Sequence, residues 1–239
     1  MACYLPGMYV VARQQSLRSQ AVDQLRGAIV TGKLEPGSMH SEQSIAADMA
    51  ISRTPIREAL LQLASEGLVE FVPQRGVRIT EFNAEHLAQV FQFRAAIEGF
   101  CAAKLAGQAR PDALSRLDAE LERQSAIIAA DDRLAWVKAN MDFHTQIVAS
   151  AGNKLMVDAL ASLASHTMRI GYRMNYRRQR MKESVDEHSA VVEAIRRRDS
   201  ERAQALAAEH LYVTTVLMKQ MFADLGINGR PQEVRNASR

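Results

Sequence analysis

Three histidines and an asparagine in the C-terminal half of the chain have the spacing of a shared metal site. Asn140 and His144 are four residues apart, so they lie on one face of a helix. His188 lies eleven residues before a turn at Asp199-Ser200 and His210 ten residues after it, which puts the two imidazoles at nearly the same height in an antiparallel helix pair. Three imidazoles and an amide oxygen suit Zn²⁺, Ni²⁺ or a similar divalent ion. The alternative is a polar core held together by histidine hydrogen bonds.

Arginines on two predicted helices could bind an anion near such a site. Arg94 lies within an apolar stripe, where an isolated cation is costly, so it either meets the carboxylate of a small effector or pairs with Glu98 one turn later. Arg169 and Arg173 are also one turn apart, in a basic stretch without an acidic residue before Glu183. They form either a solvated helix face or a rim that collects anions.

A second group of residues could read DNA. Ser52, Arg53, Thr54 and Arg57 stand at the start of a predicted helix, on the side away from its apolar stripe. There one arginine can bind guanine through two hydrogen bonds and the other a phosphate, unless both are ordinary solvated side chains. Arg75-Gly76 lies between two β-prone runs and suits a minor-groove or phosphate contact, because glycine lets the backbone come close; a plain turn is the alternative.

The elements that would carry these DNA-reading residues are three short helices and a hairpin. Apolar residues four apart predict a helix from Leu17 up to Gly32, Ser41 can cap a second helix, and Thr54-Pro55 is typical of the N-cap and first residue of a third. Residues 69–72 and 77–80 predict the two strands of a hairpin. This order of elements predicts a winged helix-turn-helix.

Downstream of residue 80 the sequence predicts helices only. No proline occurs between Pro111 and Pro231, and the remaining turn signals separate long helical patterns. The expected fold is mainly α, an N-terminal winged helix-turn-helix followed by an all-α antiparallel bundle. The bundle helices are expected at residues 84–106, 112–129, 132–150, 153–180, 183–198 and 200–225. The expected divisions are a flexible N-terminus (1–15), a DNA-binding domain (16–82), a helical effector- and metal-binding domain (83–225) and a flexible tail (226–239).

Composition excludes several classes of protein. The chain has 239 residues, 47% hydrophobic and 24% charged, which argues against a disordered or collagen-like protein. It has no apolar run near the ~20 residues of a membrane span and no secretory signal layout, so we expect a cytoplasmic protein without membrane contact. Cys3 and Cys101 are too few for a disulfide framework or a thiolate metal site. The net charge of +3 is too small to identify a polyanionic partner, and the excess of arginine over lysine is also what GC-rich coding produces.

Three short motifs resemble the winged-helix domain of GntR-family transcriptional regulators, over about residues 16–82. They are Ser52 to Leu60 (SRTPIREAL), Glu66 to Val69 (EGLV) and Pro73 to Gly76 (PQRG). The resemblance implies DNA contacts by Gln43, Arg53, Thr54, Arg57, Arg75 and Gly76. The family usually has leucine and arginine or lysine where this chain has His40 and Gln43, so a phosphate contact there is expected to be weakened.

Residues 84–223 resemble the FadR-type C-terminal domain that accompanies this winged helix in many GntR regulators. The matching positions are Phe93-Arg94, Ile97-Glu98, Asn140, Phe143-His144, Ala149 to Asn153, His188, Ala194-Ile195, Asp199 and His210. The resemblance implies that Asn140, His144, His188 and His210 bind the metal. Many members have aspartate at the first of these positions. Asparagine is a neutral donor, so weaker binding or a different metal is expected.

Together the patterns predict a sequence-specific DNA-binding transcriptional regulator, acting as a repressor and as a homodimer on a palindromic operator. Its helical domain is expected to bind a divalent metal and a small organic-acid effector that changes operator affinity. The main alternative is a metal-dependent hydrolase of helical-bundle type, but the sequence places no carboxylate beside the histidines to act as general base. A nonspecific architectural DNA-binding protein would not need a large core with a buried polar site.

Overall fold

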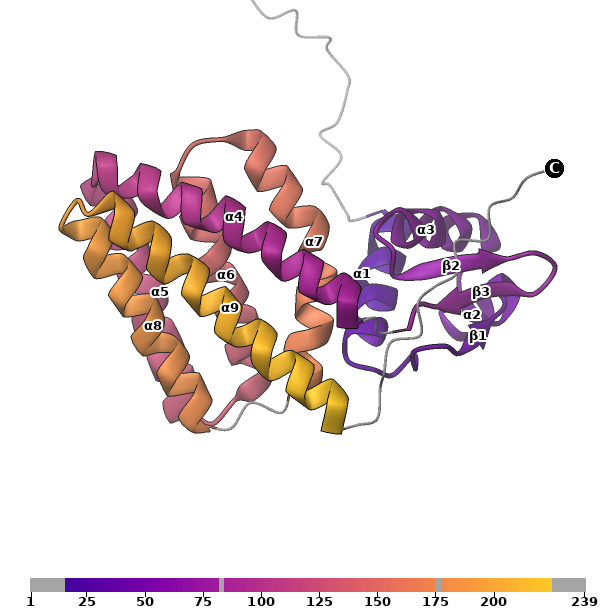
Figure 1. Cartoon of the computed structure of the whole chain (residues 1–239). Coiled ribbons are helices and arrows are strands. Elements are labelled where there is room, and N and C mark those ends of the chain that lie inside the picture. The colour runs from indigo at the N-terminus through magenta and orange to yellow at the C-terminus, as the bar shows by residue number, and fades with distance from the viewer. Residues whose placement is uncertain (1–15, 82–83, 175–177, 225–239) are drawn as a thin grey trace, which may run out of the picture.

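The computed structural model describes residues 16–81, 84–174 and 178–224. Figure 1 shows a small unit, formed by residues 16–81, beside a larger bundle of helices. The predicted flexible ends, 1–15 and 226–239, lie outside the described residues, and so do residues 82 and 83 at the predicted junction. The mainly α fold with one small sheet matches the prediction.

The small unit contains the three predicted helices, α1 (Leu17–Val30), α2 (Glu42–Asp48) and α3 (Arg53–Ser65). Ser41 caps α2 as predicted, because its hydroxyl accepts a hydrogen bond from the backbone N–H of Ser44. The N-cap of α3 is Ser52, not Thr54 as predicted, because the chain enters the helix two residues earlier. Arg53 is therefore the first helical residue of α3, at the positive end of the helix dipole.

The sheet has three antiparallel strands, β1 (Met39–His40), β2 (Val69–Val72) and β3 (Gly76–Ile79), in the order β1-β3-β2. The prediction missed β1, because two residues are too short to show an alternating pattern. Strand β3 begins at Gly76, one residue before the predicted start. Gly76 has a φ of +106°, and a Cβ there would overlap the carbonyl oxygen of His40. Glycine at this position is thus required by the fold itself.

A common hydrophobic core joins these elements. Ala21, Leu25 and Ile29 of α1 pack with the buried side of α3 and with Val77 and Ile79 of β3. The predicted α3 stripe is confirmed, since Ile56, Ala59, Leu60 and Leu63 are all buried. The opposite side of α3 is left facing solvent, where it can meet DNA.

Six helices form the bundle. They are α4 (Ala84–Gln108), α5 (Pro111–Ala129), α6 (Arg133–Ser150), α7 (Lys154–Arg173), α8 (Arg178–Arg196) and α9 (Ser200–Asp224). Local signals explain their starts: Pro111 is the first residue of α5, and Asp132 and Asn153 cap α6 and α7 through their side-chain oxygens.

The boundary between α7 and α8 differs from the prediction of helices at 153–180 and 183–198. Helix α7 ends at Arg173, Met174 has an extended conformation, and α8 already begins at Arg178. No glycine or proline lies between Arg173 and Arg178, and the prediction carried the helix past this break. Residues 175–177 lie outside the described residues.

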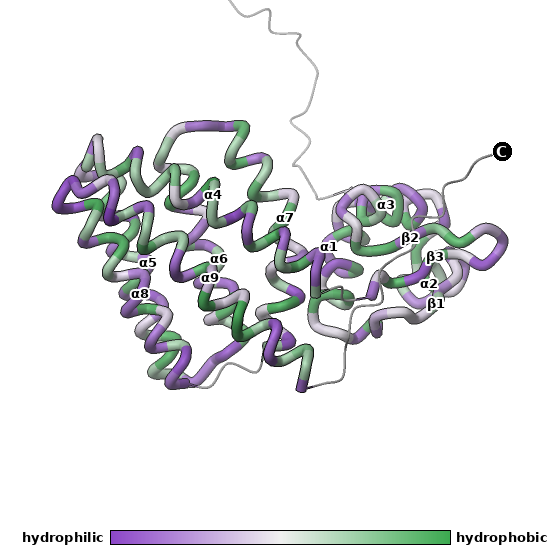
Figure 2. Tube along the Cα trace, in the orientation of Figure 1, coloured by the Kyte–Doolittle hydropathy of each residue, from purple (hydrophilic) through white to green (hydrophobic). Residues whose placement is uncertain are grey.

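The bundle helices each bury one side. In Figure 2, hydrophobic and hydrophilic residues alternate along every bundle helix, as expected for helices with one face in a core. Helices α4 and α9 pack against each other along their lengths. Helix α7 of the bundle contacts α1 of the small unit (Figure 1). No helix in the described ranges is both long enough and apolar enough to cross a membrane.

Candidate functional site

Three histidines meet in the bundle core. His144 comes from α6, His188 from α8 and His210 from α9, and all three are buried. One nitrogen atom of each lies within 4.8 Å of the others, and the Nε2 atoms of His188 and His210 are 3.3 Å apart. The prediction that these two imidazoles share one level is confirmed. Two nitrogens bound to a tetrahedral zinc at about 2.0–2.1 Å are separated by roughly 3.4 Å, so the pair fits one ion.

A side-chain oxygen lies within hydrogen-bond distance of the Nδ1 atom of each imidazole. The Nδ1 atom of His144 lies 2.6 Å from Glu98, that of His210 lies 2.6 Å from Glu187, and that of His188 lies 3.1 Å from Oε1 of Gln124. The amide nitrogen of Gln124 donates to the carbonyl of Ala139, which orients Oε1 toward His188.

An oxygen acceptor at Nδ1 places the ring proton there and leaves the Nε2 lone pair free. The lone pairs of His188 and His210 therefore lie side by side, with a nitrogen of His144 within 4.8 Å, an arrangement that a bound cation would stabilise. Sequence reasoning missed Glu98, Gln124 and Glu187 as histidine partners. Glu98 and Glu187 hold the rings from the Nδ1 side, so they orient ligands and are not placed as the general base of a hydrolase.

The electrostatics of the site favour neutral imidazoles and ionised carboxylates. Burial lowers the pKa of His144 to about 4 and that of His188 well below its usual range. Burial alone would raise the pKa of Glu98, but the charge of Arg94 and the hydrogen bonds from His144 and Arg94 lower it to about 2. The pKa of Glu187 is likewise about 2, because hydrogen bonds from His210 and Arg180 outweigh its burial. Neutral imidazole is the form that binds a metal.

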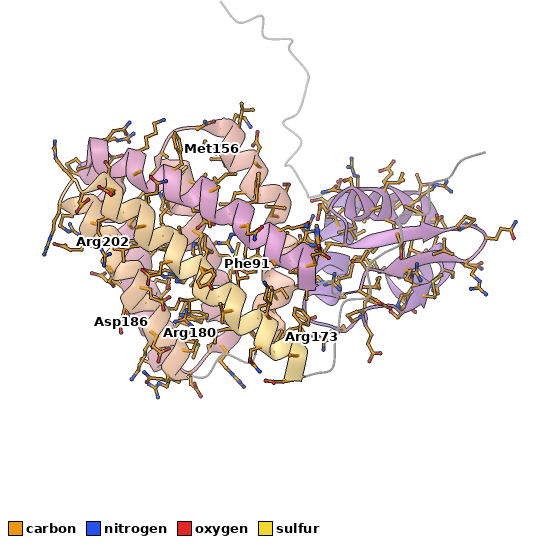
Figure 3. All side chains as sticks on the ribbon, in the orientation of Figure 1. Phe91, Met156, Arg173, Arg180, Asp186 and Arg202 are labelled. Carbon is orange, nitrogen blue, oxygen red and sulfur yellow. The ribbon has the colours of Figure 1, made fainter. Side chains whose placement is uncertain are left out.

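A small cavity of about 20 Å³ adjoins the histidines. Asn140, His144, His210 and Arg94 are among its lining residues, and so are Phe91 and Arg180, which Figure 3 labels within the bundle. Asn140 is half-buried and its Oδ1 accepts a hydrogen bond from Ser184 at 3.4 Å. The volume is enough for one water molecule.

The sequence allows two roles for Arg94: pairing with Glu98 or contact with an effector. In the structure it pairs with Glu98 and also lines the cavity. Its Nε donates to Oε1 of Glu98 at 2.7 Å, and only 1% of the side chain is exposed. Its Nη2 atom is buried without a hydrogen-bond partner among the described residues. A buried guanidinium with a free donor, next to three imidazoles, can accept an anionic oxygen.

The other two predicted effector residues lie elsewhere. Arg169 does not line the cavity; its guanidinium donates to the hydroxyl of Thr80 at 3.0 Å and to the Thr80 carbonyl at 2.7 Å, in the small unit. Arg173 is exposed and lies on the side of the bundle toward the small unit (Figure 3). Arg169 and Arg173 therefore do not line the cavity, whereas Arg180 of the same basic stretch does.

The predicted DNA-reading residues are exposed around the start of α3. The Arg53 and Arg57 side chains are 67% and 66% exposed, and a nitrogen of each lies 3.8 Å from a carboxylate oxygen of Glu42 in α2. Ser52, Thr54 and the neighbouring Gln43 are also exposed, and so is Arg75 in the β2–β3 turn. That turn points away from the bundle in Figure 1. Glu42 was not predicted; its carboxylate holds both arginines over one surface.

Comparisons with known proteins agree with this architecture. Residues 17–79 match the model for bacterial regulatory proteins of the gntR family, and residues 89–212 match the FCD domain. The chain is 28% identical to the HTH-type transcriptional repressor GlaR of Escherichia coli, over 83% of this chain and 94% of that protein. It is 27% identical to a probable D-xylose utilization operon transcriptional repressor of Paenarthrobacter nicotinovorans, over 82% and 86%.

Solved structures share the fold. E. coli McbR/YncC matches with a TM-score of 0.74 at 20% identity, over 87% of this chain and all of that chain. A GntR regulator from Rhodococcus sp. RHA1 matches with a TM-score of 0.72 at 22% identity, over 85% and 97%. The matched domains and relatives are transcriptional regulators, not enzymes. The chain therefore belongs to the GntR family of bacterial regulatory proteins and carries an FCD domain as its helical part.

Proposed function

We propose that this protein is a cytoplasmic repressor that binds a palindromic operator as a homodimer and responds to a small organic acid at a metal site in its FCD domain. One observation carries the proposal: His144, His188 and His210 each bring a ring nitrogen within 4.8 Å of the others while an oxygen partner lies at each Nδ1. Two relatives that match most of this chain are named as transcriptional repressors.

The donor set suits Zn²⁺ or Ni²⁺. His144, His188 and His210 would bind the ion through Nε2, and Asn140, in the wall of the same cavity, would add a neutral oxygen. The bound ion would supply a Lewis-acidic position for an anionic oxygen. Arg94 supports a carboxylate as the anion, because its buried Nη2 can donate to the second oxygen.

The homodimer would use the outer side of α4 and α9. Phe93 and Phe100 of α4 are 47% and 50% exposed, with Ala96 between them, and Tyr212 of the adjacent α9 is 69% exposed. Phe93 and Phe100 lie almost symmetrically about Ala96, so a two-fold axis there places Phe93 against Phe100 of the partner subunit in an antiparallel α4 pair. Such a self-complementary apolar surface favours a second copy of this chain as its partner. A dimer also presents two copies of α3, as a palindrome requires.

Calorimetry tests the metal and effector proposal. Zn²⁺ and Ni²⁺ are titrated into stripped protein, and stoichiometric binding is expected for the wild type and for the control His86→Ala but not for His188→Ala or His210→Ala. Mono- and dicarboxylates, sugar acids and phosphate are then titrated into loaded and stripped protein. We expect binding of one acid only to the loaded form, and release of operator DNA by that acid. Unchanged metal content in either histidine variant would overturn the shared site.

A further inference from the structure

We infer that α7 transmits occupation of the FCD cavity to the DNA-binding unit, through hydrogen bonds of Arg169 and His166. The inference deepens the proposed function and rests on it. It concerns how two sites in one chain are coupled, which requires an element that contacts both.

One side of α7 forms part of the cavity wall. Thr167, Ile170 and Gly171 line the cavity together with Asn140 and His210. Gly171 lies so close to α6 that a Cβ there would be 2.6 Å from Cγ1 of Val137. The cavity has room for about one water molecule, so a larger anion that enters it would press against its wall, which includes α7.

Other residues of α7 form hydrogen bonds with two residues of the small unit, Thr80 and Glu66. Arg169 donates to the hydroxyl and the carbonyl of Thr80, directly after β3, and is 3% exposed. Nε2 of His166 donates to the carbonyl of Glu66 at 2.7 Å, and Ser165 donates to the Glu66 carboxylate at 3.4 Å. Glu66 is the C-cap of α3, the helix that carries Arg53.

These contacts make a tight connection between domains. Burial of Arg169, with the nearby Arg173, lowers its pKa to about 10, which leaves the side chain charged at neutral pH. Thr80 links Arg169 to the segment between α3 and β2. Its hydroxyl donates to the carbonyl of Gly67 at 2.9 Å, and its N–H donates to the carbonyl of Leu68 at 3.1 Å. A shift of α7 therefore reaches the end of α3 and both long wing strands at once.

The expected consequence is a change in how α3 is held. When the cavity is filled, α7 moves from α6, the bonds to Thr80 and Glu66 lengthen, and the two α3 helices of a dimer lose their fixed spacing. Operator affinity then falls, while contacts with nonspecific DNA, which tolerate variable spacing, change less.

A substitution that pushes α7 away from α6 tests this coupling without knowledge of the effector. Gly171→Ala puts a methyl group into the α6–α7 contact, and Gly107→Ala in α4 is the matched control, since the nearest atom to a Cβ there is 3.9 Å away. Hydrogen exchange of the Gly67, Leu68 and Thr80 amides is measured in both variants. We expect about tenfold faster exchange in Gly171→Ala than in Gly107→Ala, as loss of one or two hydrogen bonds would produce.

Comparing Gly171→Ala with Gly107→Ala again, now in a chain that also carries Arg169→Met, tests whether Arg169 carries the effect to the small unit. Arg116→Met, at an exposed arginine, is the control for Arg169→Met. We expect the difference between the two glycine variants to disappear with Arg169→Met and to remain with Arg116→Met. If Gly171→Ala does not fold, Val137→Ile adds one methylene from the α6 side. Faster exchange confined to the bundle, or a small-unit response that survives Arg169→Met, would overturn the inference. Because no metal is added, these results are independent of the metal titration that tests the proposed function.

Discussion

At the scale of single residues, the FCD site depends on side chains that touch no ligand. Glu98, Gln124 and Glu187 set which nitrogen of each histidine is protonated. Near the start of α3, the Glu42 carboxylate lies 3.8 Å from a nitrogen of each of the exposed Arg53 and Arg57 side chains.

Replacing Glu187 with glutamine tests the orienting role. Glu187→Gln is expected to lower Zn²⁺ affinity by about 10–100-fold, because the amide is a weaker acceptor for Nδ1–H of His210. Competition with a zinc-binding dye measures the affinity. Glu183→Gln, an exposed change one turn earlier in α8, should leave it unaltered. Equal affinity in both variants would mean that Glu187 does not act through His210.

Arg53→Ala tests base reading at the start of α3. Loss of a two-hydrogen-bond contact with guanine should cost about 1–3 kcal/mol on the operator and much less on random DNA. Fluorescence anisotropy with both DNAs measures the difference, and Arg116→Ala in the bundle serves as control. An equal loss on the two DNAs would instead assign Arg53 to a phosphate.

At the scale of elements, α7 is the helix whose role the sequence described least well. Its basic residues suggested an anion-collecting rim, but the structure directs Arg169 and His166 into the contact with the small unit. The end of α7 at Arg173 also differs from the prediction, which continued this helix to residue 180.

Acid is expected to weaken the interdomain contact through His166. Burial lowers the pKa of His166, with smaller opposing effects of Glu66 and further lowering by His86 and Arg169. The unfolded chain, with a histidine pKa of about 6.5, then binds more protons than the folded one, so stability falls as the pH drops through that value. Urea unfolding at pH 7.5 and 5.5 should show a larger loss for the wild type than for His166→Gln. The same loss in both would show that His166 does not contribute.

At the scale of the whole molecule, two units are joined so that a bundle core and a DNA surface can influence each other. Both α4 and α9 turn one side toward the histidines and another, with Phe93, Phe100 and Tyr212, toward solvent. Dimerisation on that side would hold two DNA-binding units at a set distance, which links oligomer geometry to operator spacing.

Phe100→Glu tests the proposed dimer surface. A glutamate buried at the two-fold contact would lose its hydration without gaining a partner, so the variant should be monomeric by light scattering. It should also bind the operator at least tenfold more weakly, because two half-sites are no longer engaged together. Leu155→Glu, at a 79% exposed leucine of α7, is the matched control and should stay dimeric. A dimeric Phe100→Glu variant would assign the interface to another surface.

The sequence by itself determined the elements and the residues with local patterns. Helical spacing predicted α1 to α6 and α9 to within a few residues, and the counts on either side of Asp199 predicted that His188 meets His210. These features depend on neighbours within one or two turns or on a single hairpin. Short-range geometry along a regular helix is enough to derive them.

Only the tertiary structure decided which groups surround those residues. Glu98 reaches His144 across 46 positions, Gln124 reaches His188 across 64, and Arg169 reaches Thr80 across 89. The pairing of Arg94 with Glu98 is local, yet Arg94 lines the cavity beside the histidines only because α4 packs against α6 and α9. Such contacts follow from how helices pack, and the spacing of residues along the chain does not contain that information.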